Sequence, residues 1–145
     1  MMPPLVMLVD DEVPFVETMT KRLSKRNLSI VTAFNGEEAL ETLSKRRNMD
    51  VVILDVKMPG MDGIETLKEI KKSYPLTEVI MLTGHATVES AIEGMKLGAY
   101  DYLMKPCDIE KLMAKVEEAT QKKRDHEEKI REAKVKEALS THGLE

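Results

Sequence analysis

The chain has 145 residues, of which 42% are hydrophobic and 33% are charged, and its formal net charge is −4. This size suits one domain with a substantial core, and no apolar run approaches the roughly 20 residues that span a bilayer. The single cysteine, Cys107, excludes an intrachain disulfide and favours a cytoplasmic protein, while the negative charge and the scarce aromatic residues argue against direct nucleic-acid binding by this chain.

The first half of the chain alternates short apolar runs with amphipathic segments. Residues 5–9 predict a buried strand, and Pro14 opens a helix that we expect to continue to Arg26, with apolar side chains at i, i+4 and i+8. Residues 29–33 predict a short second strand. Asn35 is then placed to cap a second helix, and a glutamate three residues later fits a capping box.

The second half of the chain continues this alternation. Residues 51–54 are an uninterrupted aliphatic run, which is typical of a strand covered on both faces. The later elements follow from their apolar spacing and from the proline and glycine residues at their ends. We expect a turn-rich loop at 58–63, a helix from 64 to just before 75, a strand at 79–82, a helix at 87–97 closed by Gly98, a strand at 100–104 and a helix capped by Asp108.

Five strands that alternate with five helices predict a doubly wound α/β fold. Strand–helix alternation with short loops implies parallel pairing, right-handed crossovers and helices on both faces of the sheet. We expect a flavodoxin-like, five-stranded parallel sheet in the order 2-1-3-4-5. In such sheets ligands bind beyond the carboxyl ends of the strands, where the strand order reverses.

The composition of the chain changes near Thr120. Nineteen of the 39 residues at 107–145 are charged, and apolar positions become sparse. We therefore assign residues 1–119 to the globular domain. Residues 120–145 are expected to form a charged helical extension or linker in solvent, ending at residues 140–143.

A second interpretation of this last helix is a coiled coil. The helix contains a heptad-like series of mostly apolar residues, which Lys123 and His126 interrupt. The series is Ile109, Leu112, Val116, Ala119, Lys123, His126, Ile130 and Ala133. The sequence leaves both alternatives open.

Charged side chains close three of the predicted strands. Asp10 and Asp11 follow the first strand, Asp55 follows the third, and Lys105 follows the fifth. The first and third strands are neighbours in the expected sheet, so the three carboxylates converge, and they would repel one another unless a cation lay between them. Mg²⁺ fits, because it takes oxygen ligands and keeps waters that phosphate oxygens can replace.

Such a site can support phosphoryl transfer. An aspartate that attacks phosphorus forms an acyl phosphate, and a cation with a lysine then stabilises the charge on the transferring group. Lys105 suits this role as a point charge. Thr83 ends the fourth strand and offers a hydroxyl, and Gly84 leaves room for an anion beside the backbone.

These residues together resemble the receiver domain of two-component response regulators. The likeness covers residues 5 to about 119, and the joint occurrence of its motifs at these spacings is highly specific. The motifs are Asp10-Asp11, Asp55 with Met58-Pro59 and Met61-Asp62-Gly63, Thr83-Gly84 and Lys105-Pro106.

The resemblance implies a role for each residue of the site. Asp55 would accept a phosphoryl group from a sensor histidine kinase or a phosphotransfer protein. Thr83 and Lys105 would contact that group, so that the domain catalyses only its own phosphorylation and dephosphorylation and is not otherwise an enzyme. The implied Mg²⁺ ligands are Asp10 through water, Asp11, Asp55 and the backbone carbonyl of Lys57.

The resemblance also implies a switch. Tyr102 matches the aromatic residue that swings inward as Thr83 moves toward the phosphate, and Pro106 would follow a cis peptide bond that aims Lys105. The partner surface would lie around residues 86–97 and 100–104 and on the last helix. Lys57 and His85 stand where receivers vary and tune the phosphoryl lifetime.

Within the family, residues 82–119 resemble receivers fused to transcription-activating ATPase domains of the nitrogen-regulation type, whose last helix continues as a linker. A fused output domain, a stand-alone receiver and a phosphorylation-dependent dimer are all consistent with this likeness. Two other functions remain open. One is a small phosphatase with an aspartate nucleophile. Such enzymes usually place the nucleophile after the first strand and a second acid two residues on, and Asp10-Asp11-Glu12 does not fit that pattern well. The other is a scaffold that does not switch.

Overall fold

Five parallel strands form the centre of the fold, in the order β2-β1-β3-β4-β5. The computed structural model describes residues 2–141. The strands are β1 (Leu5–Val9), β2 (Ser29–Ala33), β3 (Val51–Leu54), β4 (Glu78–Thr83) and β5 (Asp101–Met104). The helices are α1 (Val13–Ser24), α2 (Gly36–Lys45), α3 (Gly63–Ser73), α4 (Val88–Lys96) and α5 (Ile109–Thr141). The expected flavodoxin-like fold and strand order are confirmed.

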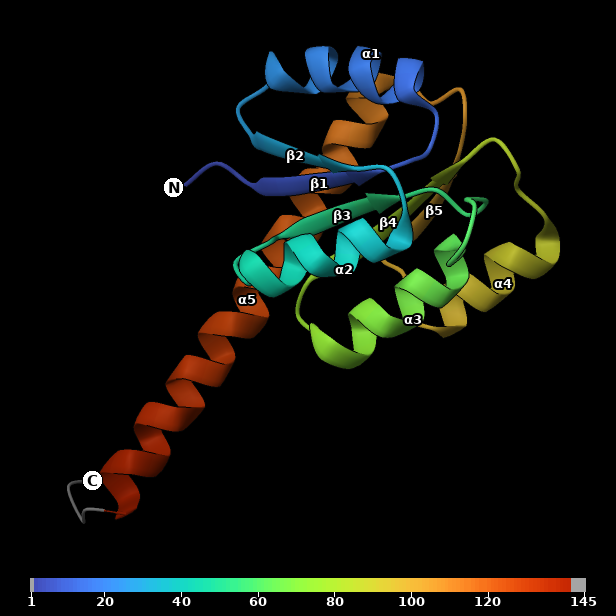
Figure 1. Ribbon diagram of the computed structural model, residues 1–145. Helices are drawn as coiled ribbons and strands as arrows, with labels where there is room; N and C mark the ends of the chain where they lie inside the picture. The colour runs from blue at the N-terminus through green and yellow to red at the C-terminus, as the bar shows by residue number, and fades with distance from the viewer. Residues whose placement is uncertain (1, 142–145) are drawn as a thin grey trace.

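Helices cover both faces of the sheet, with α1 and α5 on one face and α2, α3 and α4 on the other (Figure 1). Successive side chains of a strand point to opposite faces. In β1, Val6 and Leu8 pack with α1 and α5, whereas Met7 and Val9 pack with α2 and α3. The uninterrupted aliphatic runs in the sequence therefore reflect a sheet that is buried on both sides.

The helix ends follow the capping residues closely. Asn35 caps α2, and its side chain accepts a hydrogen bond from the Glu38 N–H at 2.8 Å. In a complete capping box the Glu38 carboxylate would accept the N–H of Asn35. Here it accepts the N–H of the preceding residue, Phe34, at 2.6 Å. After α4, Gly98 has φ 104°, the left-handed conformation that terminates a helix and favours glycine.

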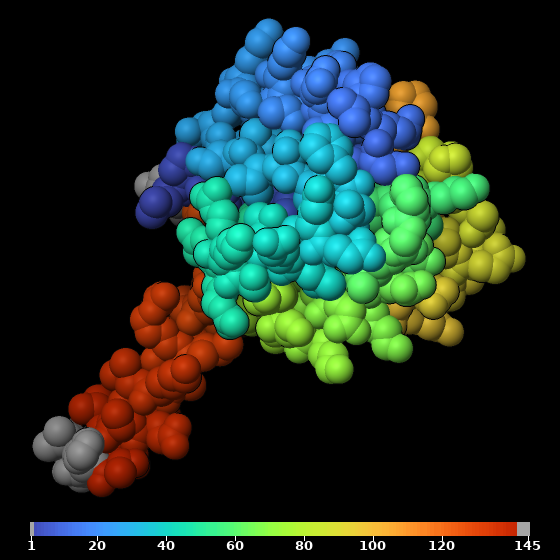
Figure 2. All heavy atoms as spheres, in the orientation of Figure 1, coloured from blue at the N-terminus to red at the C-terminus, as the bar shows by residue number. Residues whose placement is uncertain are grey.

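The last helix has two distinct parts. Its first part packs against the sheet through Leu112, Met113, Val116 and Ala119, which are all buried. Its second part projects from the body of the protein as a rod (Figures 1 and 2). The early residues of the heptad-like series therefore face the domain's own core and cannot also face a second helix.

Burial on α5 continues to Lys123, somewhat beyond Ala119, and the division of the chain at residues 119 and 120 stays a prediction. Residues 142 and 143 of the expected helix end lie outside the described residues. No helix within residues 2–141 combines the length and the apolar character that crossing a membrane would require.

Candidate functional site

Three aspartates meet at the carboxyl edge of the sheet, as the sequence predicts. Asp10 and Asp11 follow β1 and Asp55 follows β3, and one oxygen atom from each lies within 4.8 Å of the others. Asp10 and Asp55 are 1% and 2% exposed, and Asp11 is the most accessible of the three. Carboxylates this close and this buried repel one another, and three oxygen donors of this kind suit a hard divalent cation.

Backbone hydrogen bonds fix the two buried acids. The N–H of Asp10 donates to the Ala33 carbonyl at 3.1 Å, and the N–H of Asp55 donates to the Val9 carbonyl at 3.0 Å. Each bond extends the ladder between neighbouring strands by one residue past the end of the strand. One oxygen of each carboxylate is also held, because Asp10 accepts from the N–H of Glu12 and Asp55 accepts from that of Val56, both at 2.9 Å.

Lys105 reaches this group from the end of β5. Its ammonium donates to Asp10 at 2.7 Å and to Glu12 at 2.9 Å, and it lies 3.9 Å from the centre of the Phe15 ring, within cation–π range. The peptide bond between Lys105 and Pro106 is cis. Lys105 is therefore held beside the acids by Asp10 and Glu12 and is not bonded to Asp55.

The charges at the site shift one another's protonation. Burial raises the pKa of Asp10; hydrogen bonds from Lys105 and from the Glu12 N–H oppose this rise, and the charge of Asp55 adds to it. Burial acts to lower the pKa of Lys105, but the hydrogen bonds to Asp10 and Glu12 and the charge of Asp55 outweigh burial and raise it. Lys105 therefore stays a cation. It also lowers the pKa of Glu12.

Thr83 and Gly84 lie at the same edge of the sheet, at the end of β4. Thr83 is fully buried, and its hydroxyl oxygen accepts the N–H of His85 at 3.0 Å. The Thr83 carbonyl accepts the N–H of Lys105 at 2.9 Å, so the two residues are joined through the backbone. A methyl group at Gly84 would meet only the Lys105 side chain, at 3.9 Å, which leaves open space beside this backbone.

A hollow of about 350 Å³ opens beside the acids. It is lined by Asp11, Glu12, Lys57, Met58, Pro59 and His85. Lys57 therefore lies next to the acids, where its backbone carbonyl is expected as a cation ligand. His85 lines the same hollow.

Tyr102 lies apart from these groups. Its hydroxyl shares a 2.6 Å hydrogen bond with the Ser90 hydroxyl, and its ring packs beside Gly94 of α4. Ser90 also accepts the N–H of Thr87, while Thr87 accepts the N–H of Ser90, which closes the first turn of α4. The sequence did not predict a hydrogen-bond partner for Tyr102, and it did not single out Ser90.

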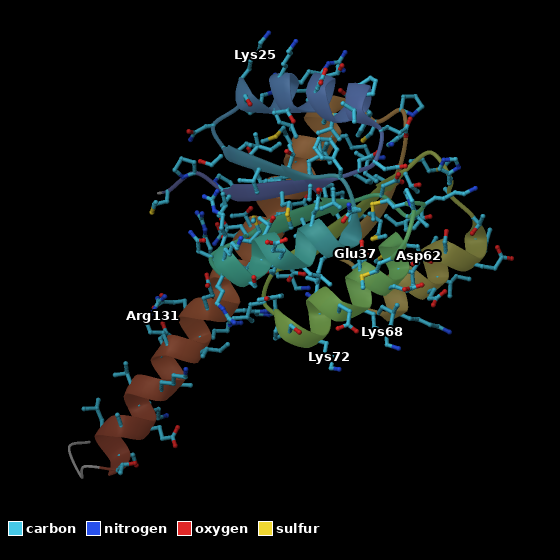
Figure 3. All side chains as sticks on the ribbon, viewed as in Figure 1. Lys25, Glu37, Asp62, Lys68, Lys72 and Arg131 are labelled. Carbon is cyan, nitrogen blue, oxygen red and sulfur yellow. The ribbon has the colours of Figure 1, made fainter. Side chains whose placement is uncertain are left out.

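Gly63 is a further residue whose role sequence reasoning missed. Asp62 caps α3 (Figure 3), and Gly63 in its first turn donates its N–H to the Val56 carbonyl at 2.7 Å. A Cβ atom at this position would lie 2.0 Å from the Asp55 carbonyl oxygen and 2.7 Å from the Val56 Cα atom. Only glycine lets α3 pack so closely against the backbone of Asp55.

Comparison with known proteins accounts for this geometry. The family model named response regulator receiver domain matches residues 6–117 of the sequence, which is most of the chain. The chain belongs to this family. Its fold is that of the receiver domain of a two-component response regulator.

Curated relatives point to one branch of the family. The chain is 39% identical over 115 residues to the DNA-binding transcriptional regulator NtrC of Escherichia coli strain K12. It is 40% identical over 114 residues to the transcriptional regulatory protein ZraR of Escherichia coli O157:H7. Each alignment covers 79% of this chain, but only 24% and 26% of the relative, so the chain spans about a quarter of the length of these proteins.

Solved receiver domains have the same fold. A receiver domain protein from Clostridium thermocellum matches with a TM-score of 0.79 and 34% identity, over 83% of this chain and 97% of that chain. The receiver domain of NtrX from Brucella abortus matches with a TM-score of 0.74 and 34% identity, over 80% and 98%. This chain is therefore an NtrC-like receiver domain in fold and in family.

We expect Gly63→Ala to lower the free energy of unfolding by about 2 kcal/mol or more, because the new Cβ atom must displace the Asp55 backbone. Urea denaturation measures this loss. Gly94→Ala is the matched control, since its Cβ atom would make only ordinary contacts of 3.6 Å and longer inside α4. It should be neutral or stabilising by roughly 0.5–1 kcal/mol, and equal effects of the two changes would contradict the role of Gly63.

Proposed function

We propose that this chain is a phosphorylation-dependent switch of a two-component system and that Asp55 is its phosphoacceptor. The observation that carries this proposal is the meeting of Asp10, Asp11 and Asp55 at one sheet edge, with the Lys105 ammonium beside them. Asp55 is buried at the end of β3, and Asp11, whose carboxylate lies within 4.8 Å of that of Asp55, lines an open hollow through which a donor could approach. The donor would be a phosphohistidine of a sensor kinase or of a phosphotransfer protein in the cytoplasm.

The chemical step follows from these groups. A carboxylate oxygen of Asp55 attacks the phosphorus, an O–P bond forms, and the P–N bond to the donor imidazole breaks with its electrons passing to the imidazole. Asp10, Asp11, Asp55 and the backbone carbonyl of Lys57 would hold Mg²⁺, with Asp10 acting through water. When bound, the ion supplies positive charge beside the transferring group.

Lys105 and Thr83 supply the remaining stabilisation. Lys105 is already desolvated and aimed at the acidic edge by Asp10 and Glu12. Its ammonium would move from one anionic partner to another as the phosphoryl group arrives. The Thr83 hydroxyl would donate to a phosphoryl oxygen, in the space that Gly84 leaves open.

The conformational switch would pass through Tyr102. The hydrogen bond between Tyr102 and Ser90 holds the ring against α4 in this state. Inward movement of Tyr102 toward the space that Thr83 vacates would break this bond and change the packing of α4 against β5.

The partner surface would then be the face of α4 and β5. Val88, Ile92 and Met95 on α4 and Met104 on β5 are large apolar side chains that are 46–72% exposed. Such a patch is typical of an interaction surface. A phosphorylation-dependent dimer through this face is one way to use it.

NtrC and ZraR bear names of transcriptional regulators and are about four times as long as the matched segment. We infer that this receiver likewise controls an output module that regulates transcription, with α5 as the connecting helix. The receiver would turn over no external substrate. Release of phosphate from added esters would favour a phosphatase instead, and failure to take up a phosphoryl group would favour a scaffold that does not switch.

We expect incubation with acetyl phosphate and Mg²⁺ to add one phosphoryl group to the chain, as measured by intact-protein mass. The adduct should be absent from Asp55→Asn and should fall strongly when EDTA removes the cation, since the acids would then repel the incoming phosphate. Asp125→Asn, a matched change on the exposed part of α5, should leave uptake unchanged. An unaltered adduct in Asp55→Asn would refute the assignment.

We expect Tyr102→Phe to shift the unphosphorylated protein toward the phosphorylated state, because it removes the hydroxyl bonded to Ser90 and leaves the ring. Loss of one such hydrogen bond is worth about 1 kcal/mol, roughly fivefold in an equilibrium. The amide resonances of α4 and β5 should move toward their positions in the phosphorylated wild type. Tyr74→Phe is the control and should cause no such movement; equal spectra for both variants would contradict this role.

A further inference from the structure

A second cluster of charges lies at the edge of the sheet opposite to the phosphoacceptor. Asp50 precedes β3 and Glu78 begins β4, and these carboxylates are 4% and 2% exposed. The same two strands lead at their other ends to Asp55 and Thr83. Neither acid takes part in the proposed phosphoryl chemistry.

Asp50 is paired by groups from two distant parts of the chain. One carboxylate oxygen accepts the N–H of Leu5 at 2.8 Å and a guanidinium N–H of Arg124 at 3.2 Å. The other oxygen accepts the ammonium of Lys123 at 3.1 Å. Lys123 is itself only 5% exposed and also lies 3.2 Å from Glu127. Removing one member of an ion pair this deeply buried would leave the other charge buried and unpaired, which is costly.

The neighbouring residues of α5 extend this cluster. Lys122 lies 3.4 Å from Glu78, which also faces Lys71 at 3.5 Å. The Glu78 oxygen nearest Lys71 accepts no hydrogen bond in the described structure, so this pair is looser than that of Asp50. Arg124 reaches back to the N-terminal segment, where it donates to the Met2 carbonyl at 2.8 Å.

These contacts hold α5 in rotation as well as in position. Three successive residues, Lys122, Lys123 and Arg124, leave a helix in directions about 100° apart. Their partners lie on three different segments, namely the starts of β4 and β3 and the residues before β1. A helix that is bonded in three directions at one level cannot turn about its axis without breaking a buried ion pair.

The cluster stands at the point where α5 leaves the domain. Among the described residues, those after Arg124 on α5 are exposed or half-buried, and their side-chain pairs, such as Arg131 with Glu128, lie within the helix. A helical segment of this length without tertiary packing is marginally stable in water unless it is nucleated at one end. The last fixed turn of α5, at residues 122–124, supplies that nucleus.

We propose that Asp50 is a positioning residue for the C-terminal helix: through Lys123 and Arg124 it fixes the direction in which residues 125–141 leave the receiver. The protein thereby presents this segment to whatever it joins or binds at one angle to the α4 and β5 face. This role is independent of phosphoryl transfer at Asp55.

The test is a distance measurement between two spin labels. Lys25 at the end of α1 and Arg131 on α5 are both labelled in Figure 3 and lie outside the cluster. Both are replaced by cysteine in a chain that carries Cys107→Ser, and a nitroxide spin label is attached to each. Pulsed electron paramagnetic resonance then gives the distribution of distances between the two labels. We expect one narrow distribution in this parent, and a broadened and shifted one when Asp50→Asn or Lys123→Met is added.

Glu41→Gln is the control, because it breaks only the exposed pair with Lys45 on α2 and should leave the distribution narrow. Lys123→Met keeps Asp50 paired with Arg124, so this variant should fold even if Asp50→Asn destabilises the protein too far. Cooperative thermal unfolding checks that each variant is folded. A narrow, unshifted distribution in a folded Lys123→Met variant, or a broad one in the parent, would overturn the proposal.

Uptake of phosphate from acetyl phosphate by the same variants separates this role from the switch. We expect Lys123→Met to take up phosphate like the parent while its label distances broaden. If Lys123→Met instead lost phosphate uptake and kept the distance distribution of the parent, the proposal that this cluster only positions the helix would be overturned. If the parent itself takes up no phosphate, the proposed function fails, and the distance test of Asp50 keeps its meaning.

Discussion

Repulsion among carboxylates at one sheet edge is the interaction on which this protein depends. A parallel sheet brings the carboxyl ends of neighbouring strands together, and here it places Asp10 and Asp55 side by side in a buried setting with Asp11 beside them. Lys105 offsets part of this charge through Asp10 and leaves Asp55 without a direct cation. This unbalanced charge suits the edge to a hard divalent cation and supports our proposal that a phosphoryl group is accepted there.

The two edges of the sheet handle buried charge in opposite ways. At the amino edge, Asp50 is paired with Lys123 and Arg124 of the same chain. At the carboxyl edge, the Lys105 ammonium is bonded to Asp10 and not to Asp55, so the charge of the three aspartates is only partly balanced. Strand β3 joins the two, with Asp50 before it and Asp55 after it. The two roles that we propose, positioning of the C-terminal helix and phosphoryl acceptance, would thus share one short strand.

The sequence was sufficient for the architecture because each strand is an aliphatic run and each helix has a regular apolar stripe. It also predicted which acids would meet, since Asp10 and Asp55 directly follow neighbouring strands. It could not predict the partners of single side chains that are far apart along the chain, such as Lys105 with Glu12 or Asp50 with Lys123. Those pairs depend on the angle at which helices cross the sheet, which apolar spacing does not encode. Gly63 was likewise missed, because only the packed backbone of Asp55 reveals the contact.

The most direct test of the central claim is to locate the phosphoryl group by chemical trapping. Borohydride reduces an acyl phosphate to an alcohol, which converts a phosphorylated aspartate to homoserine and marks its position permanently. The protein is treated with acetyl phosphate and Mg²⁺, reduced, digested and sequenced by mass spectrometry. The account predicts homoserine at residue 55 and at no other aspartate. Homoserine at Asp10 or Asp11, or none despite uptake of phosphate, would contradict it.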